Sequence, residues 1–249
     1  FWFAQAAFSP DGRTVAATAQ QGATLWDVRT GRKLREFKAG STSVWHIQGV
    51  AFSPDGKRLV LPKSVGSGFV VLDVDNGNEI YEVGSVFASL SGRSPFQVIA
   101  WSPDGRYIAG ATTLDCPREL QRHVGGKFVA PCVIRVYDAA DGSELKAIES
   151  VHMHNRYFAF SPDGKWLAAM GPLGIHVYET GSWTEKKVVS APAAGLTPVD
   201  SLSFSPDGKW LVEAGRTLKR WDAANNWARL PDVDLPFPIS NYAWMNDGK

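Results

Sequence analysis

The sequence predicts an all-β fold, a β-propeller of four-stranded antiparallel blades with five complete repeats and the first strand of a sixth. The main observation is a recurring Ser-Pro-Asp-Gly motif, which begins at Ser9, Ser53, Ser102, Ser161 and Ser205 and returns in degenerate form as Met245-Asn246-Asp247-Gly248. The Asp positions 11, 55, 104, 163, 207 and 247 lie 44, 49, 59, 44 and 40 residues apart. A four-stranded blade takes about 40–45 residues, so this period predicts a propeller.

Apolar residues flank every copy of the motif, which indicates a hairpin with a polar tip. A small residue and an aromatic one precede it: Ala7-Phe8, Ala51-Phe52, Ala100-Trp101, Ala159-Phe160, Ser203-Phe204 and Ala243-Trp244. A cation and an aliphatic residue follow each complete copy: Arg13 and Val15, Lys57 and Leu59, Arg106 and Ile108, Lys165 and Leu167, Lys209 and Leu211. Pro presets φ for the first central turn position, and Gly supplies the positive φ that rejoins a twisted hairpin. We therefore interpret the motif as architectural rather than as a catalytic array of Asp residues.

In each repeat, a further apolar stretch predicts a third strand, and this strand ends with an acidic residue. These endings are Leu25-Trp26-Asp27, Val71-Leu72-Asp73, Val136-Tyr137-Asp138, Val177-Tyr178-Glu179 and Arg220-Trp221-Asp222. Turns rich in Gly or Asn follow, and an outer strand then begins, as at Lys33 to Phe37 and Glu79 to Val83. Each repeat thus supplies four strands.

Together these motifs resemble the WD-repeat family, in its loosely spaced bacterial form, over essentially the whole chain. The resemblance implies the propeller fold and is nearly silent on function. Many family members carry a Gly-His pair and an Asp in the turn before the third strand. Here that turn reads Gln20-Gln21-Gly22 or Gly66-Ser67-Gly68, and only His152 or His154 could replace the usual His. We therefore expect blades held mainly by apolar packing between neighbouring sheets.

The repeats predict one propeller domain over residues 1–249. Their approximate bounds are 1–40, 41–86, 87–149, 150–190 and 191–231, with the start of a sixth at 232–249. Natural propellers close, because an open ring exposes sheet faces and edges. We therefore expect the chain to belong to a longer protein whose ring has six to eight blades, with completion by another chain or copy as the alternative.

The composition and the motifs exclude several classes of partner and ligand. Lys and Arg total 26 against 25 Asp and Glu, a formal net charge of +1, so no global field attracts nucleic acid or an anionic membrane. No apolar stretch approaches the length of a membrane-spanning helix, so we expect no membrane insertion. Motifs for a nucleophile, a phosphate loop or a haem are absent, and we predict no catalytic residue, no cofactor and no metal. His46, His123, His152 and His154 are the alternative metal set, but no acidic cluster accompanies them.

The third repeat carries an insertion. From the turn Gly to the acidic residue that ends the third strand, the five repeats span 15, 17, 33, 15 and 14 residues, which places extra chain at about Leu114 to Pro131. Loops this long in a compact domain are usually functional or disordered. By the family geometry, the insertion shares a rim with the connections between blades. That rim is predicted to bind a partner through basic and aromatic residues: Trp45, His46, Arg93, Arg118, Arg122, His123, Lys127, His154 and Arg156.

Both cysteines lie at the neck of the insertion, in Cys116-Pro117 and Pro131-Cys132. Across a hairpin base they could come within the Cα separation that a disulfide requires. A bridge would favour a periplasmic or extracellular compartment, whereas two free thiols would suit the cytosol, so the sequence leaves localisation open.

The sequence therefore predicts a non-catalytic scaffold that recognises a protein or peptide, with an acidic segment as one possible partner, as the sensor or interaction module of a larger protein with further domains. Rigid blades that hold several loops in one plane would keep the ordering cost of binding low. The alternative is a fragment of a periplasmic propeller enzyme or redox partner that binds a small molecule in the central channel.

Overall fold

The structure is a computed structural model that describes residues 6–19, 22–38, 49–63, 68–84, 96–112, 122–124, 127–129, 132–150, 158–171, 174–189, 201–215 and 217–236. The chain divides into two compact units, Phe1–Glu149 and Ser150–Lys249, and each is described by itself. No helix in these segments is long and apolar enough to cross a membrane.

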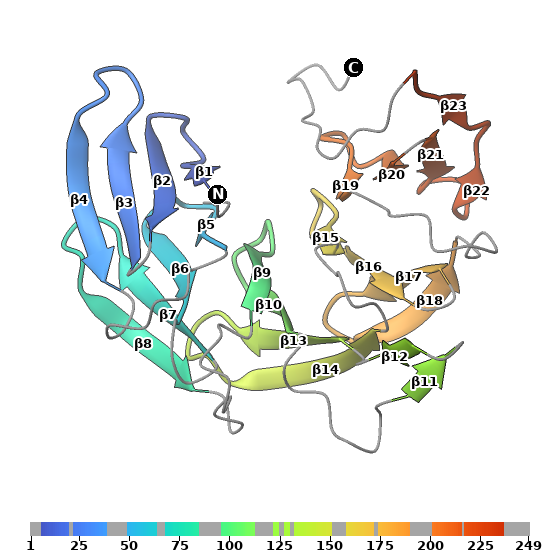
Figure 1. The fold of residues 1–249 in the computed structure, drawn as a ribbon, viewed down its shortest axis with the longest axis horizontal. Helices are drawn as coiled ribbons and strands as arrows, with labels where there is room; N and C mark the ends of the chain where they lie inside the picture. Colours follow the sequence, from blue (N-terminus) through green and yellow to red (C-terminus); the bar gives the residue numbers. More distant parts are fainter. Residues whose placement is uncertain are drawn as a thin grey trace. The chain divides into compact units, whose positions relative to one another are not determined.

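The first unit holds three antiparallel blades (Figure 1). Blade 1 consists of β1 (Ala6–Phe8), β2 (Thr14–Ala19), β3 (Gly22–Asp27) and β4 (Lys33–Lys38). Blade 2 consists of β5 (Ala51–Phe52), β6 (Arg58–Pro62), β7 (Gly68–Asp73) and β8 (Glu79–Gly84). Blade 3 consists of β9 (Phe96–Trp101), β10 (Tyr107–Thr112), β13 (Cys132–Asp138) and β14 (Glu144–Ser150). A separate two-stranded sheet, β11 (Arg122–Val124) and β12 (Lys127–Val129), belongs to the insertion.

The second unit holds two more blades. Blade 4 consists of β15 (Phe158–Phe160), β16 (Trp166–Gly171), β17 (Gly174–Glu179) and β18 (Thr184–Val188). Blade 5 consists of β19 (Ser201–Phe204), β20 (Trp210–Ala214) and β21 (Thr217–Asp222), and its outer position is shared by β22 (Ala228–Arg229) and β23 (Val233–Asp234). The prediction of four-stranded propeller blades is thus confirmed. The degenerate sixth turn lies outside the described residues.

Each Ser-Pro-Asp-Gly motif forms the turn between the first two strands of its blade. The five turn glycines have φ between 67° and 73°, as the turn chemistry requires. The Ser hydroxyl donates a hydrogen bond of 2.5–2.7 Å to the Asp carboxylate and accepts one of 2.9–3.0 Å from the first residue after the cation. The Ser side chains are buried in all five turns. The Ser is therefore the buried centre of the turn, a role that the sequence did not indicate.

Replacing this hydroxyl tests its contribution to stability. In Ser205→Ala, the partly buried backbone N–H of Trp210 loses its acceptor, and we expect the free energy of unfolding to fall by about 1–3 kcal/mol in chemical denaturation. The control is Ser182→Ala, because the Ser182 hydroxyl lies in an exposed turn of the same unit and should cost less than about 0.5 kcal/mol. Equal losses in the two variants would contradict this role.

The same hydroxyl makes the turn sensitive to acid. Its hydrogen bond to the Asp207 carboxylate, joined by those from Lys209, lowers the pKa of Asp207 from 3.8 to about 2. Because the folded pKa is the lower one, the stability contributed by Asp207 is complete above about pH 4 and is lost as the pH falls toward about 2. Thermal unfolding followed between these pH values should show a smaller loss in Ser205→Ala than in the wild-type protein.

Neighbouring blades pack through rows of three side chains that lie opposite one another on the first three strands. In blade 2 the row is Phe52, Leu59 and Leu72, and it packs on Ala16, Leu25 and Phe37 of blade 1. In blade 3 it is Trp101, Ile108 and Tyr137, which pack on Val60, Phe69 and Val71 of blade 2. In blade 5 it is Phe204, Leu211 and Trp221, which pack on Ala168, Ile175 and Val177 of blade 4. We call these three-residue sets the facing rows. They agree with the expectation of blades held by apolar packing.

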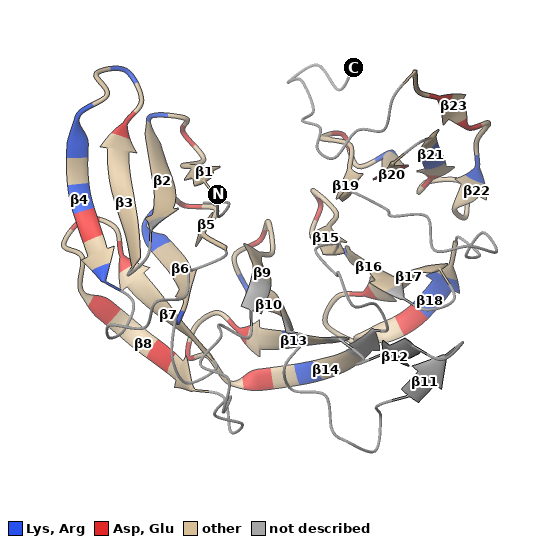
Figure 2. Ribbon diagram, in the orientation of Figure 1, with Lys and Arg blue, Asp and Glu red and all other residues tan. Residues whose placement is uncertain are grey.

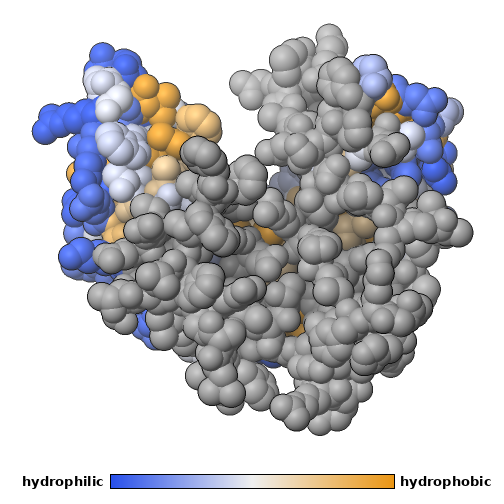
Figure 3. Space-filling model, viewed as in Figure 1, coloured by the Kyte–Doolittle hydropathy of each residue, from blue (hydrophilic) through white to orange (hydrophobic). Residues whose placement is uncertain are grey.

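Blade 1 has the same facing row without a preceding blade in its unit. Phe8, Val15 and Trp26 lie opposite one another on β1, β2 and β3, yet Phe8 is 65% exposed and Trp26 is 37% exposed. Figure 3 shows hydrophobic surface on this blade beside the hydrophilic surface of its outer strand. The exposure of Phe8 contrasts with 8% for Phe52, its counterpart in blade 2.

The outer strands are charged and irregular, which suits strands at a sheet edge. Figure 2 shows Lys, Arg, Asp and Glu spread along β4, β8 and β14. The register between the third and outer strands slips by one residue in blades 1, 2 and 4, and the bulge leaves Leu34, Ile80 and Lys186 without a partner opposite them. Leu34 and Ile80 are exposed although the apolar pattern places them in a strand.

Polar side chains fasten these outer strands to the next blade. The Arg35 guanidinium donates to the carbonyls of Asp75 and Asn76, at 2.6 and 2.9 Å. The Tyr81 hydroxyl donates to the Ala139 carbonyl at 3.0 Å. Blade 1 is therefore held to blade 2, and blade 2 to blade 3, by an apolar seam and by hydrogen bonding at the outer edge.

Candidate interaction surface

Each blade has two ends. The turn end carries the Ser-Pro-Asp-Gly motif, and at the other, which we call the insertion end, the second strand connects to the third. In blades 1, 2, 4 and 5 this connection spans residues 20–21, 64–67, 172–173 and 216 between described segments, whereas in blade 3 it spans residues 113–131 between β10 and β13. The predicted site of the insertion is confirmed.

The insertion contains a β-hairpin rather than only a loop. Arg122 lies opposite Val129, His123 opposite Phe128, and Val124 opposite Lys127 in an antiparallel pair. Its strands, labelled β11 and β12 in Figure 1, form a two-stranded sheet of their own. Only Gly125 and Gly126 separate its strands, and two glycines between short apolar runs are a hairpin signal that the sequence already contained.

The structure places only some of the predicted binding residues. Arg122 and His123 lie in β11 and Lys127 lies in β12, which brings these three together in one hairpin. Cys132 is the first residue of β13. Trp45, His46, Arg93, Arg118, His154, Arg156 and Cys116 lie outside the described residues. The proposed rim and the proposed disulfide therefore stay predictions.

Ion pairs occupy the insertion end of two other blades. In blade 2, the Lys63 ammonium lies 2.5 Å from the Glu82 carboxylate. In blade 5, the Lys219 ammonium lies 2.6 Å from Oε1 of Glu213. The Glu213 side chain is only 5% exposed, and its Oε2 has no hydrogen-bond partner in the described part of the chain. The blade 5 pair therefore carries a desolvation cost that the blade 2 pair, with a more exposed carboxylate, largely avoids.

The Glu213–Lys219 pair lies within an otherwise apolar seam. Glu213 alternates with Leu211 along β20, and Lys219 alternates with Trp221 along β21, so both share the face that packs on blade 4. The corresponding pair in blade 2 is Leu61 opposite Val70, and both are buried. The sequence did not single out Glu213, because a charged residue in a strand is ordinarily assigned to the solvent face.

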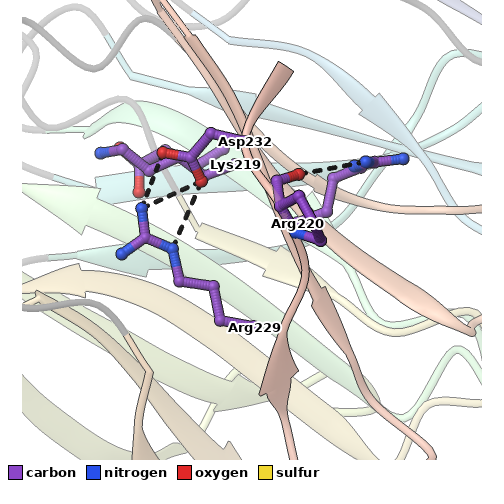
Figure 4. Close-up of polar contacts among 6 residues, drawn as sticks. Lys219, Arg220, Arg229 and Asp232 are labelled. Carbon is purple, nitrogen blue, oxygen red and sulfur yellow. Dashed lines mark hydrogen bonds and ion pairs between the residues drawn. The ribbon is translucent and has the colours of Figure 1, made fainter.

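Arg220 and Arg229, farther along blade 5, also have partners (Figure 4). Arg229 binds both carboxylate oxygens of Asp232, at 2.9 and 2.8 Å. Arg220 donates to the Pro231 carbonyl at 3.1 Å. Both arginines of this part of blade 5 therefore have partners within the blade.

The buried pair gives a third prediction. Lys219→Val leaves the Glu213 carboxylate buried without its counter-charge and should lower the free energy of unfolding by about 3 kcal/mol. The double variant Glu213→Leu with Lys219→Val copies the blade 2 pair and should recover most of that loss in the same denaturation experiment. Lys209→Val is the control, since Lys209 pairs with Asp207 in the exposed turn. A double variant no more stable than the single one would contradict the explanation.

Among the described residues, every clear shift moves a pKa farther from neutral pH: the carboxyl pKa values are lowered and the tyrosine pKa values are raised. Hydrogen bonds from Ser9 and Ser53 lower the pKa values of Asp11 and Asp55. Burial, with the Glu185 carboxylate nearby, raises the pKa of Tyr178 to about 12. Groups tuned for proton transfer would shift toward the working pH instead. The described residues also contain no group of three or more His, Cys, Asp or Glu that could hold a metal ion.

Similarity to known proteins agrees with this geometry. The family model described as "WD domain, G-beta repeat" matches residues 186–222, which include β19, β20 and β21 of blade 5. Residues 186–222 thus match a WD repeat, and the recurring four-stranded blades are those of a β-propeller. The predicted resemblance is thereby confirmed, on a match within one repeat and on blades that recur through both units.

A solved structure agrees with this fold. This chain is similar to a chain of "Kuenenia stuttgartiensis Hydrazine Synthase", with 22% sequence identity and a TM-score of 0.64. The match covers 90% of this chain and 64% of that chain, so this chain spans less than two thirds of its length. At this identity the likeness shows the fold alone. No curated protein matches the sequence.

Proposed function

We propose that this WD-repeat chain is a non-catalytic scaffold that recognises a protein or peptide segment at the insertion end of blade 3. WD repeats on a propeller fold support a protein-interaction scaffold in general. The observation that supports the location is the hairpin β11–β12, because an ordered element stands where the other blades have short connections. The partner proposed for it is acidic, since the hairpin strands contain Arg122, His123 and Lys127 and no carboxylate.

Rigid blades make such a site effective. Neighbouring blades are fixed by their facing rows and by outer-edge hydrogen bonds, so the strands that carry the insertion do not need to be ordered on binding. A preorganised surface loses less conformational entropy when a partner binds.

Deletion of residues 117–130 tests the function. The full-length protein, intact and with this deletion, would be used to capture binding proteins, which mass spectrometry would then identify. We expect a specific partner to bind the intact protein and to be lost on deletion, while thermal unfolding changes little because the insertion pairs outside the blade sheets. A partner that binds both forms equally would contradict the proposed site.

The alternative from the sequence is a propeller of an enzyme or redox complex, and the similar solved structure bears the name of an enzyme. Its 22% identity does not transfer that activity, so no substrate is proposed. Identification of a small molecule that co-purifies equally with both forms would favour this alternative over the scaffold.

The state of the cysteines is a separate prediction about the base of the site. A Cys116–Cys132 bridge would close the insertion and could contribute about 3 kcal/mol to stability. We expect titration under denaturing, non-reducing conditions to find no free thiol in protein from an oxidising compartment. Two free thiols would exclude the bridge and leave the scaffold proposal unaffected.

A further inference from the structure

The facing row of blade 1 is exposed, whereas the same row is buried in blades 2, 3 and 5. Phe8 is 65% exposed, and no member of those three buried rows is more than 8% exposed. Val28, which follows β3, is also exposed, and its counterpart Val74 in blade 2 packs on blade 1. We call Phe8, Val15, Trp26 and Val28 the open face. An exposed apolar patch rimmed by polar residues marks an interaction surface.

The seams between blades show what such a row packs on. Each buried row contacts a second row on the preceding blade, formed by three residues that lie opposite one another on its first three strands. These receiving rows are small and aliphatic: Ala7, Ala16 and Leu25 in blade 1, Ala51, Val60 and Val71 in blade 2, and Ala159, Ala168 and Val177 in blade 4. Small residues opposite aromatic ones let the two sheets interdigitate. The open face therefore fits the receiving row of a further blade.

The receiving row of blade 5 is different, because it has a charged member. It consists of Ser203, Val212 and Arg220, so Arg220 stands where blade 4 has Val177. A guanidinium buried against an aromatic row without a counter-charge loses its hydration with no compensation. The open face therefore favours a row like those of blades 1, 2 and 4.

A second copy of the chain offers no better row. The receiving rows of blades 1, 2 and 4 are already covered by the blades that follow them, and Ala109 and Val136 in the row of blade 3 are fully buried. Among the described blades this leaves the row that contains Arg220. The sixth repeat, by contrast, begins with the required residue type, since Ala243 precedes Trp244 as Ala159 precedes Phe160.

The turn between β3 and β4 gives the open face a basic rim. In the seam between blades 1 and 2, the Arg35 guanidinium of blade 1 donates to the carbonyl of Asp75, in the corresponding turn of blade 2, at 2.6 Å. Arg29 takes the position of Asp75 in blade 1, and Arg32 and Lys33 follow in the same exposed turn (Figure 2). A cation on the occupant would meet like charge at this position, whereas a carboxylate would complement it.

We propose that the open face of blade 1 seats a further blade of the same polypeptide, which has an uncharged receiving row of small and aliphatic residues and an acidic side chain on its outer strand beside Arg29. Phe8 and Trp26 then fill the role that Phe52 and Leu72 have in blade 2. Occupancy of this face does not depend on a partner at the insertion end.

Hydroxyl-radical footprinting of the purified full-length protein measures whether the face is covered. We expect Phe8 to be protected as strongly as Phe52, whereas Leu34, exposed on the outer strand of the same blade, reacts freely. Phe8 as reactive as Leu34, each corrected for its intrinsic reactivity, would overturn the proposal. Protection of Phe8 that disappears on dilution to the monomer would assign the face to a second copy and also overturn it.

Two matched serine variants of the full-length protein test the seam by its stability. Phe8→Ser should lower the midpoint of thermal unfolding by about 5 °C or more, because a polar residue replaces a packed aromatic one. Leu34→Ser changes an exposed residue outside the open face and should lower the midpoint by less than about 2 °C. Small and equal shifts in the two variants would mean that solvent covers the face, which excludes a seated blade.

Charge reversal tests the rim. Arg29→Glu should lower the midpoint by about 2 °C more than Arg32→Glu, and about 0.5 M salt should remove the difference, because the pair with the acidic side chain is near the surface. Arg32 is the control, since its counterpart Asn78 lies three residues beyond the carbonyl that Arg35 binds. A higher midpoint in Arg29→Glu, or equal effects of the two changes, would overturn the acidic blade assigned to this face.

Discussion

Rows of aromatic and aliphatic side chains lose nearly all their exposure where one blade packs on the next, and this burial positions everything else in each unit. A fully buried side chain of this size contributes about 1.5–3 kcal/mol, so the three members of one facing row outweigh any single hydrogen bond in the same seam. Both faces of a central blade must therefore be apolar. Blade 2 meets this demand by alternation, since Leu59 and Leu61 face blade 1 whereas Val60 faces blade 3.

The ends of the blades are under different constraints. At the turn end, a buried Ser, an Asp and a Gly satisfy the backbone within a few residues, so the same geometry recurs five times. At the insertion end nothing comparable is repeated among the described residues, and the connection between the second and third strands is free to vary. Inserted residues there leave the facing rows intact, because Ile108 and Tyr137 still lie opposite each other in blade 3. Binding elements can therefore be added at that end without weakening a seam.

Much of the fold follows from local chemistry, and so the sequence predicted it. The turn position requires a positive φ, which Gly supplies, and apolar residues on either side of a turn predict a hairpin. Both signals are local and do not depend on the rest of the chain. The features that the sequence did not predict depend on contacts between distant residues or on irregular strand pairing. Glu213 is buried because blade 4 covers it, and Leu34 is exposed because a bulge shifts it out of register. At the candidate site the insertion was predicted from spacing, but the hairpin within it was not.

The facing rows also bear on how such a chain changes over generations. Blades 2, 3 and 5 each offer an aromatic and aliphatic row to the preceding sheet, and blades 1, 2 and 4 receive it on small, aliphatic and, in blades 1 and 2, aromatic residues. The two surfaces are chemically interchangeable between repeats. A gene encoding them can thus gain or lose one repeat by unequal recombination and still join compatible faces, which makes blade number an easily altered trait while the turn and seam residues stay under selection.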